Sequence, residues 1–184
     1  MINELFRDIK DRMSKTIDHY RSELASIRTG RASVSILDTL KVDYYGTPTP
    51  VKNMAQVNVP EPQLIVIQPF DPNSLSEIEK AITNSDLGLN PNNDGNVIRL
   101  NIPALTDERR KELVRIIHQI IEEARVSIRN IRRDANENLK KWNKEHEVSD
   151  DNLKRAMDDV QEITDNMIKE LNQIQDFKEK EIME

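Results

Sequence analysis

The 184-residue sequence contains no cysteine, only four glycines, and few aromatic residues, which make up 4% of the chain. The lack of cysteine excludes disulfides, thiolate metal sites and cysteine nucleophiles. No apolar run approaches the roughly 18 residues that a membrane-spanning helix requires. The N-terminus lacks a signal-peptide pattern, and Glu4, Asp8 and Asp11 argue against an organellar transit peptide. These absences predict a cytoplasmic protein without a membrane partner.

Charge, in contrast, is abundant: Asp, Glu, Lys and Arg make up 33% of the chain, and its net charge is −6. High charge with few aromatics is typical of long solvated helices rather than of a β-sandwich or barrel. Residues 106–146 carry 11 basic and 8 acidic side chains, whereas residues 147–184 carry 5 basic and 12 acidic ones. Because salt screens charges beyond about 8–10 Å, the net negative charge does not exclude polyanion binding by a basic face.

The stretch Thr106–His146 is predicted to form one long helix with two adjacent stripes. At about 100° of rotation per residue, its apolar side chains fall within an arc of roughly 140°, and a basic and polar arc of roughly 100° lies beside it. The apolar stripe consists of Leu113, Ile116, Ile117, Ile120, Ile121, Ala124, Ile128, Ile131, Ala135, Leu139 and Trp142. The basic stripe consists of Arg125, Arg129, Arg132, Arg133, Asn136 and Lys140. The apolar stripe requires partner helices, but the basic stripe is not needed for that packing.

Two further amphipathic helices are predicted at the ends of the chain. Residues 1–29 place apolar side chains at steps of three and four, with Asn3 as a candidate N-cap. Gly30 sits where a left-handed C-cap would end this helix. The last helix is predicted to begin after Ser149, and Thr106 is the candidate N-cap of the middle one.

Residues 31–105 differ in character, because all eight prolines lie in this segment. Short runs there fit β-strands separated by Gly, Pro and Asp turn signals, and Pro48–Pro50 is predicted to be a rigid turn. One helix is predicted after the capping-box sequence Ser74–Glu77. The predicted strands are Leu40–Tyr45, Gln56–Val59, Leu64–Gln68 and Val97–Ile102. The segment is therefore predicted to be a small α+β domain.

Together these elements predict an α+β fold. Residues 1–30 and 106–184 would form an antiparallel three-helix bundle, and the small domain of residues 31–105 would be inserted between its first and second helices. Two chain crossings would join the two bodies, and so narrow a joint is expected to permit a variable interdomain angle. The predicted hinge residues are Gly30, Arg31, Ala104 and Leu105.

No pattern for catalysis or cofactor binding is present. His19, His118 and His146 are widely spaced and fit no metal site or catalytic triad. The Gly-x-x-x-x-Gly-Lys-[Ser/Thr] motif is absent, so there is no P-loop to bind GTP. We therefore expect a protein that is not an enzyme and that needs no metal or cofactor.

On spacing alone, the basic stripe has two interpretations. It can be a solvated face whose arginines pair with glutamates such as Glu122 and Glu137. Alternatively, it contacts phosphates, since arginine rather than lysine occupies most of its basic positions and arginine suits bidentate phosphate contacts. These positions, the candidate RNA-binding residues, are Arg125, Arg129, Arg132 and Arg133.

Several longer motifs follow one another along the chain. They are Arg28–Ser33 (RTGRAS), Tyr44–Pro50 (YYGTPTP), Ser85–Asn92 (SDLGLNPN), Leu105–Arg110 (LTDERR) and Arg129–Asn136 (RNIRRDAN). In these motifs, in its length and in its helix–insert–helix–helix order, the whole chain resembles the ribosome recycling factor family.

The resemblance implies both a function and partners. With elongation factor G and GTP, such a protein splits the post-termination ribosome into subunits and frees message and deacylated transfer RNA. In the family, the bundle lies against large-subunit ribosomal RNA through arginines that correspond here to Arg129, Arg132 and Arg133. The resemblance also implies an L-shaped molecule, and GTP hydrolysis would then belong to the partner. We expect this protein to be a monomer.

Two other functions are compatible with parts of the sequence. Helical periodicity alone also permits a coiled-coil adaptor or chaperone-like protein, which would self-associate or bind a client protein through an exposed apolar seam. A hydrolase on the inserted domain would need a pocket that the sequence does not reveal.

Overall fold

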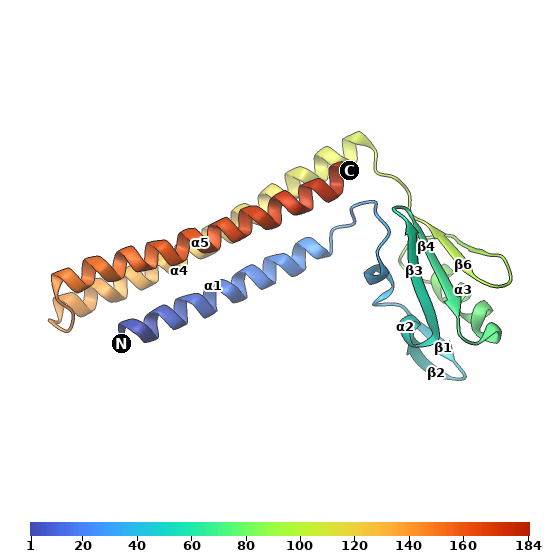
Figure 1. Cartoon of the computed structure of the whole chain (residues 1–184), viewed down its shortest axis with the longest axis horizontal. Coiled ribbons are helices and arrows are strands. Elements are labelled where there is room, and N and C mark those ends of the chain that lie inside the picture. The colour runs from blue at the N-terminus through green and yellow to red at the C-terminus, as the bar shows by residue number, and fades with distance from the viewer. The chain divides into compact units, whose positions relative to one another are not determined.

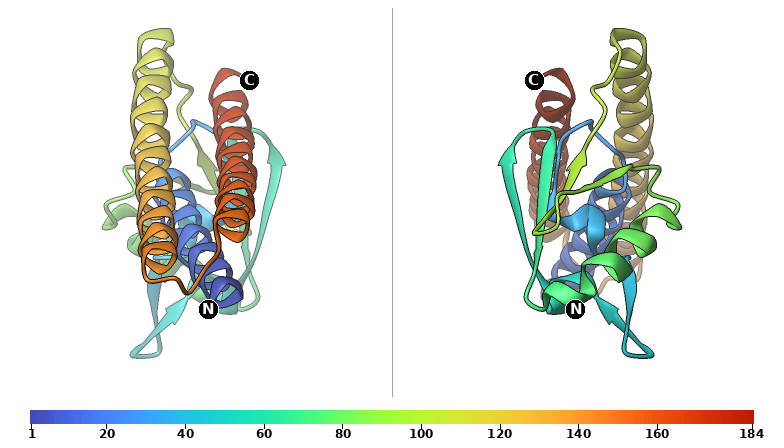
Figure 2. Two further views of the ribbon diagram at one scale, coloured as in Figure 1. Left: turned by 90° about the vertical axis from the view of Figure 1, so that its left-hand side faces the viewer. Right: turned by 90° about the vertical axis from the view of Figure 1, so that its right-hand side faces the viewer.

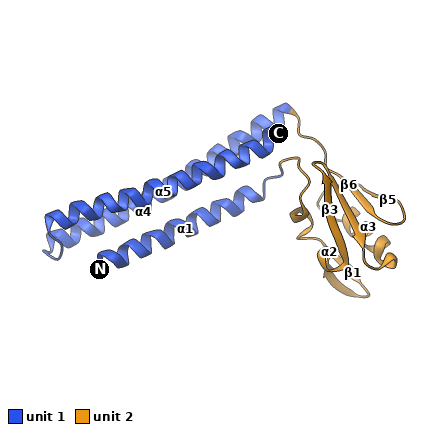
Figure 3. Cartoon of the chain, viewed as in Figure 1, with its two compact units in different colours: residues 1–28, 107–184 blue, residues 29–106 orange.

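A computed structural model describes residues 1–184, and the chain divides into two compact units (Figures 1 and 3). Unit 1 comprises residues 1–28 and 107–184, and unit 2 comprises residues 29–106. Long helices build unit 1, whereas unit 2 combines short strands with short helices. The predicted α+β class is confirmed.

Unit 1 is a bundle of three helices, α1 (Ile2–Ala25), α4 (Asp107–Lys144) and α5 (Asp150–Met183). Helix α4 runs antiparallel to the other two, and Figure 2 shows the three nearly end-on. Nine members of the predicted apolar stripe of α4 are buried, and only Ile116 and Trp142 are half-buried. The core is completed by one side of α1 and one side of α5, so the 3.6-residue periodicity correctly predicted which faces meet.

The three helices differ in length, and this divides the bundle into two parts. Helix α1 has 24 residues and α4 has 38, which at 1.5 Å per residue gives about 36 Å and 57 Å. Near its C-terminal end, α1 is tied to α5 by an ion pair of 2.7 Å between Arg21 and Glu170. Beyond Ala25, α4 and α5 continue as a pair, held by His118–Glu179 (2.7 Å) and by a hydrogen bond from Arg110 to the Met183 carbonyl (2.8 Å).

The predicted ends of the helices are partly wrong. Helix α1 ends at Ala25, where Ser26 is its C-cap in the right-handed conformation, so Gly30 does not terminate it. The N-cap of α1 is Met1, and Asn3 lies inside the helix. The prediction for Ser149 is confirmed, because its hydroxyl accepts a hydrogen bond from the Asn152 amide.

Unit 2 contains two antiparallel sheets. In the smaller sheet, β1 (Lys41–Tyr44) pairs with β2 (Thr47–Pro50). The larger has the order β3-β4-β6-β5, with strands β3 (Ala55–Glu61), β4 (Leu64–Pro69), β6 (Ile98–Asn101) and β5 (Pro91–Asn93). The helices are α2 (Val51–Met54) and α3 (Leu75–Thr83), with 3₁₀ turns at Val34–Leu37 and Pro72–Ser74.

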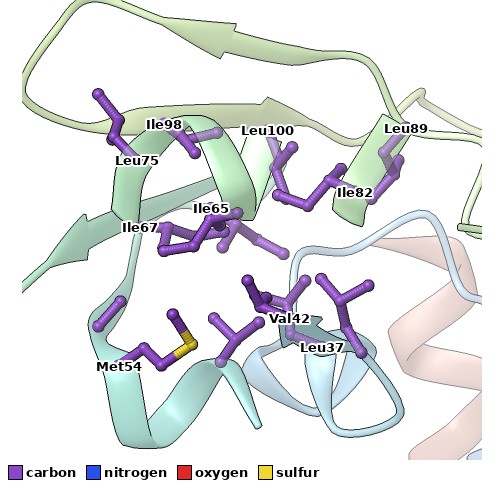
Figure 4. Close-up of a cluster of buried hydrophobic side chains, with 14 residues drawn as sticks. Leu37, Val42, Met54, Ile65, Ile67, Leu75, Ile82, Leu89, Ile98 and Leu100 are labelled. Carbon is purple, nitrogen blue, oxygen red and sulfur yellow. The ribbon is translucent and has the colours of Figure 1, made fainter. Parts of the chain in front are cut away.

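A separate hydrophobic core holds unit 2 together (Figure 4). Ile65 and Ile67 of β4 and Ile98 and Leu100 of β6 alternate with more exposed neighbours, so both strands bury the same face. Helix α3 contributes buried apolar side chains to the same core. The remaining members come mainly from the 3₁₀ turn at Val34–Leu37, from β1 and from α2, and they include Leu37, Val42, Val51 and Met54.

All four strands predicted in this segment exist, with slightly different ends, but β2 and β5 were not predicted. Pro48–Pro50 belongs to β2 and is not a turn. This strand pairs with β1 alone, so its prolines, which lack an N–H, are tolerated beside an open edge. The predicted capping box was also wrong. The Ser74 hydroxyl donates to the Asp71 carbonyl (2.7 Å) and does not accept a hydrogen bond from a backbone N–H of α3.

Candidate nucleic-acid interface

The four arginines predicted to bind RNA lie within two and a half turns in the middle of α4. Arg125, Arg129 and Arg132 are half-buried, and Arg133 is exposed. None of them is fully buried. Their hydrogen-bond partners differ, however, and divide the arginines of the basic stripe into a first half, Arg125 and Arg129, and a second half, Arg132 and Arg133.

Arg125 is held by three partners. Its guanidinium donates to Asn172 Oδ1 (2.6 Å) and Gln175 Oε1 (2.9 Å) on α5, and to Glu122 Oε2 (3.3 Å) on its own helix. Its side chain is only 27% exposed. Arg125 therefore joins α4 to α5, in addition to any contact that it makes with a ligand.

Arg129 shares the same carboxylate. Its guanidinium forms an ion pair with Glu122 Oε1, so Glu122 bridges Arg125 and Arg129. The hydrogen bond from Arg129, followed by that from Arg125, lowers the pKa of Glu122 below its usual value. Glu122 thus stays ionised at neutral pH and neutralises part of this half of the stripe.

Arg132 and Arg133 have neutral partners. Arg132 donates to the amide oxygen of Gln161 on α5 (3.0 Å), and Arg133 donates to that of Asn130 (3.3 Å). An amide orients a guanidinium without cancelling its charge. Glu137, which the sequence offered as a neutralising neighbour, forms no ion pair with either, and Asp134 is bound instead by Arg12 of α1 (2.8 Å). The charge of both arginines therefore remains available to an external anion.

The partners on α5 are the part of this interface that sequence reasoning missed. Asn172, Gln175 and Gln161 orient Arg125 and Arg132 across the helix pair. Side chains of this kind carry no periodic signal, because solvated amides are common on any exposed helix face. Only the register between α4 and α5 identifies them.

At the predicted hinge, the two chain crossings touch. Gly30 has φ of +72°, a conformation that disfavours residues with a Cβ, and a Cβ there would lie 2.8 Å from Leu105 Cγ. Arg31 and Ala104 beside them are exposed. The close approach explains why glycine occupies this position, whereas the hinge function of these four residues stays a prediction.

Other kinds of site find little support in the structure. No group of three or more His, Asp or Glu side chains is arranged to hold a metal ion. None of the helices combines the length and the apolar character needed to cross a membrane. The large hydrophobic residues exposed on unit 1 are Met1 before α1, Val126 on α4, and Phe177 and Met183 on α5.

Comparison with known proteins identifies the family. The family model for ribosome recycling factor matches residues 20–183, which is most of the chain. The chain belongs to the ribosome recycling factor family. Among curated relatives, the ribosome-recycling factor of Syntrophomonas wolfei is 56% identical over 184 residues and covers both chains completely. That of Clostridioides difficile is 52% identical over 181 residues, 98% of each chain.

Solved structures of ribosome recycling factors match the fold over the same range. A solution structure of the ribosome recycling factor has a TM-score of 0.77 and 44% identity, and the match covers 99% of this chain and 97% of that one. A second match covers both chains completely, with a TM-score of 0.67 and 47% identity. It comes from models of the T. thermophilus ribosome recycling factor and the E. coli elongation factor G bound to the E. coli post-termination complex. The resemblance found in the sequence is therefore confirmed.

Proposed function

We propose that this protein is a translation factor that binds the post-termination ribosome and, with elongation factor G and GTP, splits it into subunits. Ribosome, message and deacylated transfer RNA would then be recycled. The observation that carries this proposal is the identity of 50% or more to ribosome-recycling factors over the full length of the chain. A ribosome recycling factor of 47% identity, described with elongation factor G on the post-termination complex, supports the choice of partners.

Within this function, the basic stripe is the proposed contact with large-subunit ribosomal RNA. Arg132 and Arg133 are its principal residues, because their charge is not neutralised by a carboxylate. Arg129 would join them after exchanging Glu122 for a phosphate, and Arg125 would mainly hold α5 in place. Guanidinium groups with amide partners are well suited to bidentate phosphate contacts.

The remaining features of the proposal concern energy and location. The sequence has no P-loop, so we propose that elongation factor G hydrolyses the GTP and that this protein is not itself an enzyme. It would act in the cytoplasm, as a monomer and without a cofactor. The two units would be separate domains, joined by a hinge at Gly30, Arg31, Ala104 and Leu105.

A ribosome-splitting assay tests the proposal. Purified post-termination ribosomes are mixed with this protein, elongation factor G and GTP, and subunit separation is followed by light scattering. Splitting should require all three additions. The Arg132→Gln variant should bind large subunits more weakly at matched salt, although its circular-dichroism melt should be unchanged. Equal affinity of variant and parent would refute the RNA-binding role of the stripe, and no splitting by the parent would refute the function.

The hinge has its own test. Because the chain has no cysteine, two introduced cysteines, one on each side of the joint, can form only one disulfide cross-link. Cross-linking should leave ribosome binding intact and abolish splitting, whereas reduction of the disulfide should restore it. Splitting at the parent rate by the cross-linked protein would show that motion at the joint is not needed.

A further inference from the structure

Two large aromatic side chains are exposed on unit 2, and Asp71 links their positions. Tyr45 at the tip of the β1–β2 hairpin is 79% exposed, and Phe70, which follows β4, is 69% exposed. Asp71, next to Phe70, connects them, because its Oδ2 accepts a hydrogen bond from the Tyr45 hydroxyl (3.2 Å). We call Tyr45, Phe70 and Asp71 the aromatic patch. Exposed apolar side chains that gather beside polar ones are typical of an interaction surface.

The backbone turn and two side-chain contacts orient Tyr45. It has φ of +50° and precedes Gly46 with φ of +84°, the conformation of a two-residue type I′ turn. Such turns favour Asn-Gly or Asp-Gly, and a bulky residue at a positive φ is unusual. The ring also packs edge-on against Tyr44, at 4.6 Å between centroids, and Tyr44 in turn packs against the core of unit 2. The turn alone therefore does not explain why a tyrosine occupies this position.

The carboxylate of Asp71 is fixed as well. Its Oδ1 accepts a hydrogen bond from the Asn73 amide (2.9 Å), while Oδ2 accepts from Tyr45. Each carboxylate oxygen has a second lone pair, so both can still accept a hydrogen bond from an external donor. A ring and a carboxylate that neighbouring groups already orient lose less freedom when a ligand binds than unsupported side chains do.

The charges around the patch indicate the sign of that ligand. The segments that hold the patch, residues 41–52 and 64–76, contain two acidic side chains, Asp43 and Asp71, and two basic ones, Lys41 and Lys52, of which Lys52 is paired with Asp38. Unit 2 as a whole carries 5 basic and 8 acidic side chains. A surface of this charge repels phosphates, which disfavours stacking on RNA bases. It attracts cations, and aromatic faces bind guanidinium groups in particular.

We propose that the aromatic patch binds an arginine side chain of a partner protein, with the guanidinium stacked on an aromatic ring and paired with Asp71. If the proposed function holds, this partner is a protein component of the recycling complex, so unit 2 makes a protein contact while the stripe on α4 contacts RNA. The chemistry of the patch itself does not depend on that function.

The first test uses small probes and the full-length protein. The ring signals of Tyr45 and Phe70 are followed by NMR during titration with acetyl-Gly-Arg-Gly-amide, the same peptide with citrulline, and hexauridylate. The arginine peptide should shift both rings, and Asp71→Asn should weaken its binding by about threefold, in the range of an exposed ion pair. Val59→Thr, at another exposed apolar residue of unit 2, is the matched control. Equal shifts with citrulline, stronger shifts with hexauridylate, or no shift would overturn the proposal.

The second test uses ribosomes. Tyr45→Asn with Phe70→Ser removes both rings while keeping a residue that suits the turn, so the double variant should fold. It should bind large subunits within about twofold of the parent and split ribosomes about tenfold more slowly, since buried aromatic anchors dominate protein interfaces. Splitting at the parent rate would overturn a role for the patch in recycling. Failure of the parent to split ribosomes would overturn the proposed function and leave the peptide result to decide on the patch.

Discussion

The two halves of the basic stripe on α4 have the same residue type and a similar position but a different chemical state. Arg125 and Arg129 share the carboxylate of Glu122, and Arg125 also holds two amides of α5. Arg132 and Arg133 hold only neutral amides. The first half therefore contributes to the bundle, whereas the charge of the second is not neutralised by a carboxylate, as its proposed role in RNA binding requires. Spacing on a helix reveals a stripe, but the partners of each side chain decide its role.

Removal of the second half should have the largest effect. Arg132→Gln with Arg133→Gln should weaken binding to large subunits by about 100-fold at low salt, at about 1.5 kcal/mol for each charge-assisted contact. The slope of log affinity against log salt should fall by about 2. Filter binding at several salt concentrations measures both. A loss below threefold would show that these arginines are a solvated face.

Removal of Arg125 should instead affect stability. Arg125→Ala loses two hydrogen bonds to α5 and leaves Asn172 and Gln175 without that partner, so the free energy of unfolding should fall by about 1–2 kcal/mol. Binding to large subunits should change by less than about threefold, because its charge is already shared with Glu122. Urea denaturation measures the first effect. An affinity loss as large as that of the double variant would erase the distinction between the halves.

Conversion of the first half into a copy of the second should increase binding. Glu122→Gln keeps the size of the side chain but removes the charge that Arg125 and Arg129 share. Affinity for large subunits should rise by about threefold, within the range of an exposed ion pair. Glu137→Gln is the matched control, since Glu137 pairs with none of the four arginines, and it should have a smaller effect. Identical results for both would mean that only the overall charge matters.

Acid should produce the smallest effect. The pKa of Glu122 is lowered in the folded protein, so its contribution to stability is present above its usual pKa near 4.5 and is lost as the pH falls through the lower value. The free energies of unfolding of the parent and of Glu122→Gln should therefore differ by a constant amount between pH 6 and 7, and the difference should shrink as the pH falls below 4.5. Urea denaturation at pH 6 and at pH 3.5 measures this. Divergence on acidification would contradict the assigned ion pairs.

The bundle was largely predictable from the sequence because its core is encoded locally. Leu113, Ile117 and Ile121 mark the inner face of α4 by spacing alone, and partner helices have to cover it. Helix ends were less predictable: the apolar periodicity continues to Ile27, but α1 stops at Ala25. Unit 2 depends on pairing between distant segments, so β2 with its prolines and the very short β5 were missed.

The candidate site shows the same limit. The arginines were visible as a stripe, and Glu122 was recognised as a neighbour that could neutralise part of it. The amides of Gln161, Asn172 and Gln175 were not predicted, because they belong to another helix and their positions depend on the register between α4 and α5. The ion pair between Asp134 and Arg12 was not predictable for the same reason, because it depends on the register between α1 and α4. Through this pair, Asp134 is bound to Arg12 and does not neutralise the adjacent Arg133.

The unequal lengths of the helices have a mechanical consequence. Where α1 is present, bending the bundle has to compress one helix against two others, but beyond Ala25 only two helices resist. The three-helix part of unit 1 should therefore resist bending more strongly than the two-helix part. Amide protons near Arg110 and Met183 should exchange with solvent sooner than those near Ile128. A force applied to the bundle would deform the two-helix part first and leave the four arginines in the middle of α4 in place.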